Sequence, residues 1–384
     1  DATGNGNQAS DIYTVQAGSP AAEFDRYIAD IRRVIEGDAE LSLRSTLGVN
    51  QRMNRDARER FVAQIGMNSA CADRSTTSND DRDQCDRTIL SENNVPFGIN
   101  GGLVANGGTL STSGTAFGQT SNVDGTSRRL IFGDFDIQRD EETGSSVATG
   151  TGRVAWEWMA SSKTLLGYFV GGELAHSNIA SAFDGDQNRV GVTVGSYAVH
   201  ELGERTYLDG FLTFGAGRNN LEIANSVLAL ESDYTTQSMT FGTSLSGVVE
   251  KNGFDIWPEL SFSYGRTWIG DVGFTGRAYG LVDNTLSLDA GSVLVANIMF
   301  RPEFRVPLDG LPSVSSLQLF TFAPRLICEQ LKATATEEGC GGGAEIGFTG
   351  QAANELGTYS AKISADRVGN RTNSALQLNL EHRF

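Results

Sequence analysis

A histidine and a serine stand next to each other in the stretch AHSN, at His176 and Ser177. A hydroxyl beside an imidazole could serve as an activated nucleophile in hydrolysis. The residues around them alternate between apolar and polar, which predicts a β-strand, and neighbouring side chains of a strand point to opposite faces. The stretch GTSLSG at 242–247 lacks the Gly-x-Ser-x-Gly spacing of a nucleophile elbow. We therefore expect no catalytic residues and no enzymatic activity.

The four cysteines form two pairs of near neighbours, Cys71 with Cys85 and Cys328 with Cys340, and each pair flanks a polar stretch. Closing a loop of about 15 residues stabilises a protein by roughly 3 kcal/mol in the chain-entropy model. None of the histidines lies near a cysteine in the sequence, which disfavours a zinc site. We expect two disulfides, an oxidising compartment, and neither a metal nor a cofactor.

The composition excludes some partners and leaves others open. The chain has 384 residues, with 30 Lys and Arg against 47 Asp and Glu and a formal net charge of -17. This acidic balance argues against nucleic acid as a partner, because phosphate binding needs a basic face. The sequence has no run of about 18 apolar residues, which is the length that would predict a transmembrane helix. A transmembrane strand needs only about 10 residues, half of them apolar, so an outer-membrane barrel has an ordinary composition.

The first 127 residues differ from the rest. Residues 20–36 predict an amphipathic helix that Ser19 caps, Pro20 begins and Gly37 ends. Residues 50–66 predict a second helix with a narrow apolar stripe of Met53, Ala57, Phe61 and Ile65 on a charged cylinder. A stretch rich in Gly, Ser and Thr follows at 98–127. We expect a helical and loop region over 1–127 that is a plug, a linker or a passenger remnant.

From Arg128 onward, apolar and polar residues alternate again and again. In 286–306, the longest such segment, the even positions are nearly all apolar and the odd positions carry the charges. Short connections such as ASSK alternate with longer ones such as EQLKATATEEG, as periplasmic turns alternate with extracellular loops in membrane barrels. Twelve such segments lie at 128–140, 147–159, 164–178, 188–201, 206–220, 234–250, 254–268, 286–306, 314–328, 340–350, 357–367 and 373–384.

These patterns predict an all-β fold, a twelve-stranded antiparallel transmembrane β-barrel over 128–384 that lies in the lipid bilayer of the bacterial outer membrane. Odd and even positions of a strand face opposite sides, and this parity places the residues between the apolar ones on the lumen wall. They are charged and polar side chains, together with glycines such as Gly167. The lumen-lining set is Arg153, Glu157, Glu173, Asn297, Arg301, Glu303, Arg305, Lys362 and Asp366. Two interpretations stay open: salt bridges that brace the barrel, or a pore lining that contacts a threaded segment or ions.

The tryptophans are expected at the edges of the membrane. Trp156 and Trp158 fall near the periplasmic end of their strand and Trp268 near the extracellular end of another, where aromatic girdles lie. Trp257 is an odd number of residues from Trp268, so it faces the lumen unless Pro258 marks a bulge.

The stretch NRVGVTVGSYAVHELGERTYLDGFLTFGAGRNNLEI at 188–223 resembles the central strands of autotransporter β-domains. The resemblance rests on a short turn, an aromatic-x-Asp-Gly group and a Gly-Arg-Asn cluster, here Tyr207, Asp209, Gly210, Gly217, Arg218 and Asn219. It covers residues 128–384. It implies a twelve-stranded barrel that the barrel-assembly machinery folds into the outer membrane, with a helix in its pore and an N-terminal passenger at the cell surface. The segment in the pore is expected to be 50–66 or 98–127.

The chain ends in ALQLNLEHRF, with Leu376, Leu378, Leu380 and Phe384 on one face of a strand. A last strand with a terminal aromatic residue resembles the signal that the barrel-assembly machinery reads. His382 stands where an apolar residue is usual in that signal. The leading hypothesis is an autotransporter-type anchor that translocates or displays its N-terminal segment. The alternative is a structural or porin-like barrel with a plugged lumen that docks partner proteins.

Overall fold

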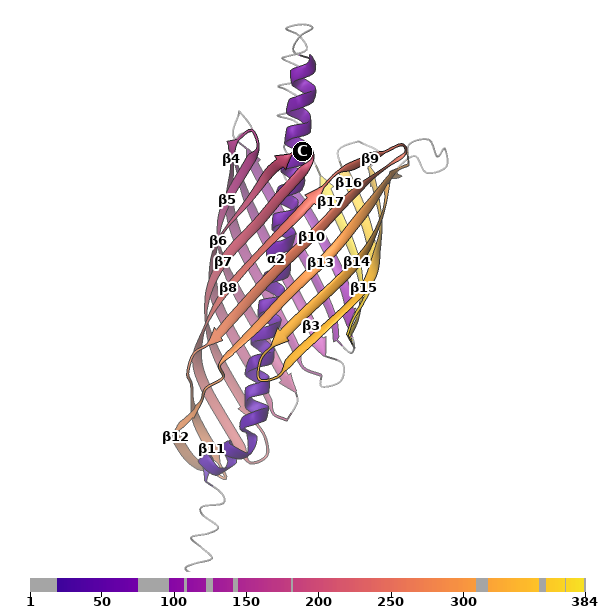
Figure 1. Cartoon of the computed structure of the whole chain (residues 1–384). Coiled ribbons are helices and arrows are strands. Elements are labelled where there is room, and N and C mark those ends of the chain that lie inside the picture. The colour runs from indigo at the N-terminus through magenta and orange to yellow at the C-terminus, as the bar shows by residue number, and fades with distance from the viewer. Residues whose placement is uncertain are drawn as a thin grey trace, which may run out of the picture.

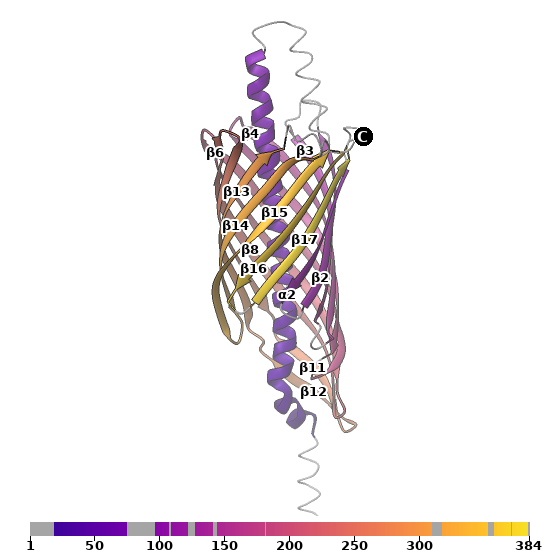
Figure 2. The same cartoon turned by 90° about the vertical axis from the view of Figure 1, so that its right-hand side faces the viewer.

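The computed structural model describes residues 19–74, 97–106, 109–121, 127–140, 144–180, 182–308, 317–351, 357–369 and 371–382. They form one long helix inside a wall of strands (Figures 1 and 2). The helix α2 spans Pro20–Arg74. The strands are β1 Phe97–Asn106, β2 Thr109–Ser121, β3 Ser127–Asp140, β4 Ser146–Ser161, β5 Thr164–Ala180, β6 Asp184–Gly203, β7 Thr206–Ala224, β8 Leu228–Gly247, β9 Val249–Lys251, β10 Phe254–Ile269, β11 Val272–Ala278, β12 Leu281–Leu288, β13 Ser292–Pro307, β14 Leu317–Lys332, β15 Thr336–Gln351, β16 Gly357–Val368 and β17 Arg371–His382.

The wall is a closed antiparallel barrel, because β1 pairs with both β2 and β17. Ile99 of β1, for example, lies opposite Ala116 of β2 and opposite Leu380 of β17. The short β9 continues β8, while β11 and β12 prolong β10 and β13, so fourteen strands surround the lumen. Closure leaves no strand edge of the membrane wall facing lipid.

The expectation of twelve strands is wrong. The described residues of the twelve expected segments lie almost entirely in strands, but β1 and β2, which precede residue 128, complete the wall. The outer face of β2 carries Thr112, Gly114 and Ala116, and its inner face carries mainly hydroxyl side chains. This alternation has little hydrophobic contrast, so the sequence pattern resembles a loop. The stretch 98–127 therefore does not fill the pore, because most of it forms wall strands.

The two ends of the barrel are defined by where the wall strands begin and end. We call the rim with Phe97 of β1 and His382 of β17 the proximal rim, and the opposite one the distal rim. The long loops expected at the distal rim are mostly strands. β5 ends at 180 and β6 begins at 184, and likewise β14 ends at 332 and β15 begins at 336. β6 and β8 each have 20 residues, or about 65 Å at 3.3 Å per residue.

The helix is one continuous element of 55 residues, about 80 Å long at 1.5 Å per residue. The expected start is confirmed: Pro20 is the first helical residue, and the amide of Ala22 donates a 3.3 Å hydrogen bond to Ser19 Oγ. The expected end at Gly37 is wrong, since the helix continues through Gly37 and Gly48. Each glycine costs a helix about 1 kcal/mol relative to alanine, and packing of the helix against the wall outweighs that cost.

The wall changes character along its length. Over most strands the outer face is apolar and exposed, with Val192, Phe214, Leu260, Ile298 and Leu378 as examples, and this apolar belt surrounds the barrel. Beyond the belt lies the distal extension, which we define as the distal ends of β5–β8 together with β11 and β12. Here the apolar side chains face inward, among them Leu221, Ile223, Leu230 and Phe274, while Asn220, Glu222 and Asp233 face outward.

The segment 286–306 crosses this change and is two strands rather than one. Leu286 and Leu288 of β12 are buried on the inner face, whereas Ile298 and Phe300 of β13 are exposed on the outer face. The faces exchange at 289–291, where Gly291 has a φ of 66° that favours glycine. In the described part of the chain, no helix has both the length and the apolarity to cross a membrane.

Candidate functional site in the barrel lumen

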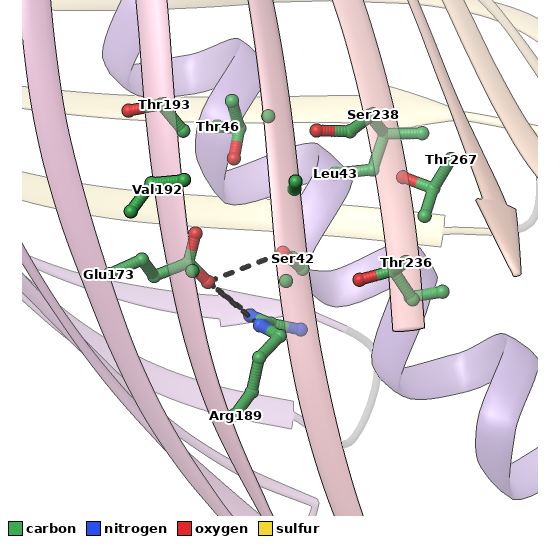
Figure 3. Close-up of a pocket in the computed structure, with 15 residues that line it drawn as sticks. Ser42, Leu43, Thr46, Glu173, Arg189, Val192, Thr193, Thr236, Ser238 and Thr267 are labelled. Carbon is green, nitrogen blue, oxygen red and sulfur yellow. Dashed lines mark hydrogen bonds and ion pairs between the residues drawn. The ribbon is translucent and has the colours of Figure 1, made fainter. Parts of the chain in front are cut away.

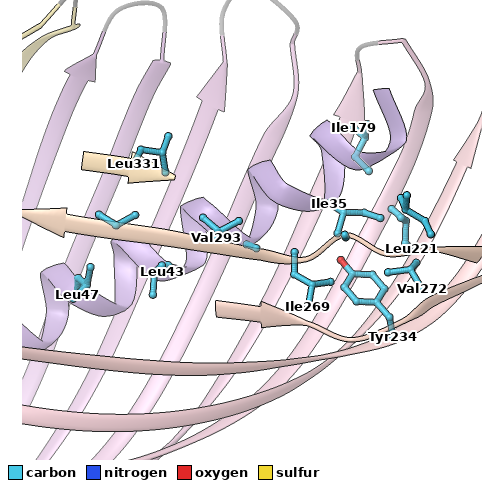
Figure 4. Packing of buried hydrophobic residues seen from close by; sticks show 14 of the residues in the cluster. Ile35, Leu43, Leu47, Ile179, Leu221, Tyr234, Ile269, Val272, Val293 and Leu331 are labelled. Carbon is cyan, nitrogen blue, oxygen red and sulfur yellow. The ribbon is translucent and has the colours of Figure 1, made fainter. Parts of the chain in front are cut away.

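The helix runs through the lumen, with its N-terminal end beside β11 and β12 and its C-terminal end past the proximal rim (Figures 1 and 2). The part near the distal rim packs in an apolar collar, shown in part in Figure 4. We define this collar by Phe24, Ile31, Ile35, Leu43 and Leu47 of the helix and Leu221, Leu230, Ile269, Val272, Phe274, Leu286 and Val293 of the wall. The ring of Phe24 lies 5.6 Å from that of Phe274, and Ile31 and Ile35 are fully buried. Burying such side chains is worth about 1.5–3 kcal/mol each.

Asp38 lies between the collar residues Ile35 and Leu43 and makes polar contacts with the wall. One carboxylate oxygen accepts a 2.8 Å hydrogen bond from Ser177 Oγ, and the other accepts bonds from Gln187 Nε2 at 2.8 Å and Arg189 Nη1 at 3.0 Å. Gln187 also donates to the hydroxyl of Tyr234 at 2.9 Å. Tyr234 lies beyond the apolar belt, where burial, followed by the charge of Asp38, raises the pKa of its hydroxyl.

Glu173 of β5 holds the next turn of the helix. It accepts hydrogen bonds from Arg189 Nε at 3.0 Å and from Ser42 Oγ at 3.4 Å (Figure 3). Beside this pair lies a cavity with an empty volume of about 460 Å³, bounded by the helix and by hydroxyl side chains such as Thr193, Thr236 and Ser238. The wall here places small and hydroxyl side chains against the helix, so the helix approaches it closely.

The middle of the lumen contains a buried ionic cluster around Arg58. Its guanidinium donates hydrogen bonds to Asp209 Oδ2 at 2.9 Å, Ser244 Oγ at 2.9 Å and Glu259 Oε2 at 2.7 Å. Asn54 also donates to Asp209, and Arg55 donates to Glu259 at 3.0 Å. One turn of helix is therefore bound to β7, β8 and β10 by charged side chains that are taken out of water. These contacts stabilise the helix only when each charge meets its partner, because an unpaired charge buried at this site costs free energy.

Asn50 and Arg60 join the helix to other strands. The Asn50 amide donates to Thr213 Oγ1 and Thr240 Oγ1, both at 3.0 Å, and its oxygen accepts a 2.7 Å bond from Arg153. Arg60 pairs with Glu157, which also accepts a 2.9 Å bond from the hydroxyl of Tyr197. The three expected lumen residues Arg153, Glu157 and Glu173 thus lie where parity predicts and contact the helix directly or share its network.

The other expected lumen residues form a brace within the wall. Arg301 donates to Glu345 at 2.8 Å and pairs with Glu303, which accepts a 2.6 Å bond from Arg305. Farther round, Asp366 accepts a 2.6 Å bond from Arg325, and Lys362 lies 3.8 Å from Glu345. Asn297 faces inward between Ser263 and Glu329. Arg305 alone of this set reaches a described helix residue in an ion pair, Glu59 at 3.5 Å. Salt bridges within the wall thus connect most of these residues, whereas Arg153, Glu157 and Glu173 contact the helix or its network.

Trp257 faces the lumen, and its strand passes Pro258 opposite Pro302 without a bulge. The guanidinium of Arg305 lies 3.9 Å from its ring centroid. The expected girdle residues lie on the outer face: Trp158 and Trp268 are exposed, and Trp156 stacks on Tyr168 with ring centroids 5.1 Å apart.

Cys328 and Cys340 form a disulfide, as expected, but across two paired strands rather than around a loop. They are register partners in β14 and β15, on the outer face near the distal rim. The tip of this hairpin contacts the helix, because the amide and hydroxyl of Thr334 donate to Glu36 at 3.2 and 2.6 Å. Cys85 lies outside the described residues, so the pairing expected for Cys71 and Cys85 stays a prediction.

The last strand carries Leu376, Leu378 and Leu380 on the outer face, all exposed, and Phe384 lies outside the described residues. Their side chains complete the apolar belt where β17 meets β1. A closed wall with an apolar outer belt, a polar lumen and all of its ladder hydrogen bonds internal is the arrangement that a strand protein needs to cross a bilayer. The chain is an outer-membrane β-barrel.

No protein-family model and no curated protein sequence matches this outer-membrane barrel. Solved structures similar to it include the translocator domain of the autotransporter NalP from Neisseria meningitidis, 14% identical with a TM-score of 0.44 over 81% of this chain and 97% of that one. The β-domain of the Bordetella autotransporter Brka is 15% identical, with a TM-score of 0.43 over 75% of this chain and 98% of that one. The monoaromatic hydrocarbon channel CymD is 9% identical, with a TM-score of 0.47 over 75% and 88%.

Sequence reasoning missed several of the residues that bind the helix. Asp209 was part of the motif at 188–223, yet it had no expected role, and Asp38, Arg189 and Glu259 were not singled out. Parity could have found Asp209 and Glu259, since each is a carboxylate at an inward position of a strand with apolar outward neighbours. For Asp38 the pattern has no such signal, because a charge on a helix is usually solvated.

Proposed function

We propose that this outer-membrane barrel is an autotransporter-type β-domain, which anchors and displays the chain that precedes Ser19 outside the cell. The observation that carries the proposal is the direction of the helix. It enters the lumen at the distal rim beside β11 and β12 and leaves it at the proximal rim, where β1 begins. With the proximal rim in the periplasm, as for barrels whose wall strands begin and end there, anything before Pro20 is held on the outside.

The contacts of the helix support an anchor. The apolar collar and the ionic cluster around Arg58 bind successive turns of one element, so a load on its N-terminal end meets many contacts. The resemblance of 188–223 to autotransporter β-domains supports the same function. We propose no catalytic role, and we propose the barrel-assembly machinery as the partner that inserts the barrel, with β17 and Phe384 as the segment it reads.

Surface display tests this proposal. An epitope tag fused before Asp1 should bind antibody on intact cells, and protease added outside should remove it. The matched control carries the same tag in the proximal turn at Asn252 and Gly253, which should become accessible only after the outer membrane is permeabilised. Antibody binding to the second tag but not the first on intact cells would reverse the topology and refute the proposal.

The second candidate is a structural or porin-like barrel that docks partners, with the helix as a permanent plug. The burial of the helix contacts favours it, because the helix is part of the fold. The two candidates differ in what they do with a foreign domain. A small folding-competent domain placed before Asp1 should reach the surface if the barrel is a translocator, and should stay in the periplasm if the helix only fills the lumen.

A further inference from the structure

One strand of the wall carries an arginine at each edge of the apolar belt. On the outer face of β3, Arg129 and Arg139 are exposed, and between them lie the half-exposed side chains of Ile131, Phe135 and Ile137. The two arginines are ten residues apart, or about 33 Å along a strand at about 3.3 Å per residue. At a strand tilt of about 40° this gives a height of about 25 Å, which is the height of the apolar band of membrane barrels. Arg129 therefore lies at the proximal surface of the membrane, at the level of lipid headgroups.

Arg129 lies beside three aromatic rings of the outer face. Its guanidinium is 6.0 Å from the ring centroid of Trp156, which is its register partner on β4. Trp156 stacks on Tyr168 of β5, and Trp158 meets the same Tyr168 edge-on, with ring centroids 5.8 Å apart. We call Arg129, Trp156, Trp158 and Tyr168 the headgroup patch. Rings with a polar edge suit this level of a membrane, because one side meets hydrocarbon and the other meets water.

The charge of Arg129 has no carboxylate partner in the part of the chain that the structure describes. Arg218, another exposed arginine of the outer face, differs in this respect, since it pairs with Asp233 at 3.3 Å. On the strands around Arg129, carboxylates such as Asp134 and Glu157 face inward. The anion that a bilayer supplies at this level is a lipid phosphate, and a guanidinium binds phosphate oxygens with two hydrogen bonds at once.

Farther into the apolar belt, the same strands leave room for an acyl chain. A row of register partners across β2–β5 consists of small, exposed residues, and we call it the trough: Ala116, Gly133, Gly152 and Gly172. A Cβ on Gly133 or Gly152 would meet nothing within 4 Å. Gly133 is four residues from Arg129 on the same strand, which is about 13 Å at about 3.3 Å per residue. A chain that descends from a headgroup at Arg129 therefore reaches the trough.

We propose that the headgroup patch binds one glycerophospholipid of the membrane leaflet on the proximal side. Arg129 donates hydrogen bonds to the phosphate, the three rings pack against the glycerol and ester groups, and one acyl chain lies in the trough. The phosphate distinguishes this ligand from a neutral lipid, and the acyl chain distinguishes it from a free anion. The site lies on the outside of the barrel, so it does not depend on what the helix or the chain before Ser19 does.

The test is native mass spectrometry of the full chain, purified in detergent and titrated with dioleoyl phosphatidylethanolamine. The chain should bind one such lipid more tightly than any further one. Arg129→Gln should weaken this first binding step about tenfold or more, because charge-assisted hydrogen bonds to the phosphate are lost. Arg218→Gln is the matched control and should leave the affinity unchanged, since Arg218 is exposed on the outer face but pairs with Asp233. Equal affinities for the two variants would refute the proposal.

Two further comparisons identify the parts of the lipid that are bound. Dioleoylglycerol, which has the acyl chains without the phosphate, should bind weakly, and inorganic phosphate should not displace the phospholipid. Tight binding of dioleoylglycerol would mean that only an apolar surface is present, and displacement by phosphate would mean an adventitious ion only; either result would overturn the site.

Filling the trough tests the place of the acyl chain. Gly152→Leu should weaken the first binding step, because its side chain would occupy the trough. Ala216→Leu is the matched control: Ala216 is exposed in the same row of the wall, on β7, but lies outside the trough. Both side chains point away from the wall, so heat-modifiable gel mobility should show folded barrels. An unchanged affinity in Gly152→Leu would refute the proposal.

Discussion

The guanidinium of Arg58 donates a 2.9 Å hydrogen bond to the carboxylate of Asp209, and the two side chains are only 6% and 1% exposed. This pair joins the middle of the helix to β7 where neither partner has water as an alternative. An interaction of this kind specifies one axial position of the helix, because a shift by a single turn would separate the two buried charges.

Replacing Asp209 by alanine should lower the free energy of unfolding by about 3 kcal/mol, since Arg58 and Asn54 then lose a buried partner. Denaturant titration of the purified barrel, followed by tryptophan fluorescence, measures the change. Asp233→Ala is the matched control: its partner Arg218 lies 3.3 Å away, but the two side chains are 74% and 55% exposed. That exposed pair should contribute less than about 1 kcal/mol. Equal losses for the two variants would contradict a helix held by buried ion pairs.

Removing a side chain from the apolar collar should destabilise the barrel more than removing one from the outside of the same strand. Leu286 of β12 is 6% exposed and Leu281 is 47% exposed. Leu286→Ala should destabilise the folded state by about 2–5 kcal/mol through the cavity it leaves. Leu281→Ala should change little. Limited proteolysis of the helix near Ile31 reports the effect, and a barrel in which the two variants are cut at the same rate would rule out the collar as the clamp.

Two glycines should respond to alanine in opposite directions. Gly37 lies in the helix, and a Cβ there would meet nothing within 4 Å. Gly37→Ala should raise the free energy of unfolding by about 1 kcal/mol, because alanine favours the helix. A Cβ at Gly167 would enter the ring of Tyr197, whose hydroxyl bonds Glu157. Gly167→Ala should therefore lower the melting temperature, and a rise for both variants would show that the ring is free to move.

The disulfide between Cys328 and Cys340 should hold the β14–β15 hairpin over the helix. Its removal should cost about 3 kcal/mol for a closed loop of this size, where the sequence separation is 12. Hydrogen exchange at the amide of Thr334, which donates to Glu36, should become faster in Cys328→Ser/Cys340→Ser. The same double replacement at Cys71 and Cys85 is the control and should leave this amide protected.

The end of the chain should matter for assembly rather than for stability. Deleting Phe384 should reduce the amount of barrel in the outer membrane more than His382→Tyr alters it, because the deletion removes the terminal aromatic residue. Fractionation of cells, with heat-modifiable gel mobility as the measure of folding, tests this. Normal membrane levels after the deletion would refute the role proposed for the last strand.

Much of the wall could be predicted because lipid imposes alternation. Wherever outward positions carry residues such as Ile298 and Leu378 and inward positions carry charge, a period of two identifies the strand and its facing. β1 and β2 were not predicted as strands because glycine and asparagine in β1, and glycine, serine and threonine in β2, weaken that contrast. The exchange of faces at 289–291 could not be predicted, because apolar residues occupy the even positions in both halves of 286–306. Only the helix packed against β12 makes Leu286 an inward residue.

The lumen could be predicted in part. The alternation of the strands predicts an inward set of residues, but the partners of each charge depend on the axial position of a helix that no local pattern specifies. Gly37 and Gly48 predict breaks in an isolated helix. The collar and the ionic cluster supply the packing that keeps one helix through both, and that packing is tertiary.

The geometry of the helix determines how the barrel would bear a mechanical load. A pull on Pro20 from the distal side acts along the axis of the helix, parallel to the wall. The collar and the pairs at Asp38, Asn50 and Arg58 would then be sheared together, rather than peeled away one after another. A barrel loaded in this way resists extraction with the sum of its contacts, so tethering strength increases with the length of helix that remains seated.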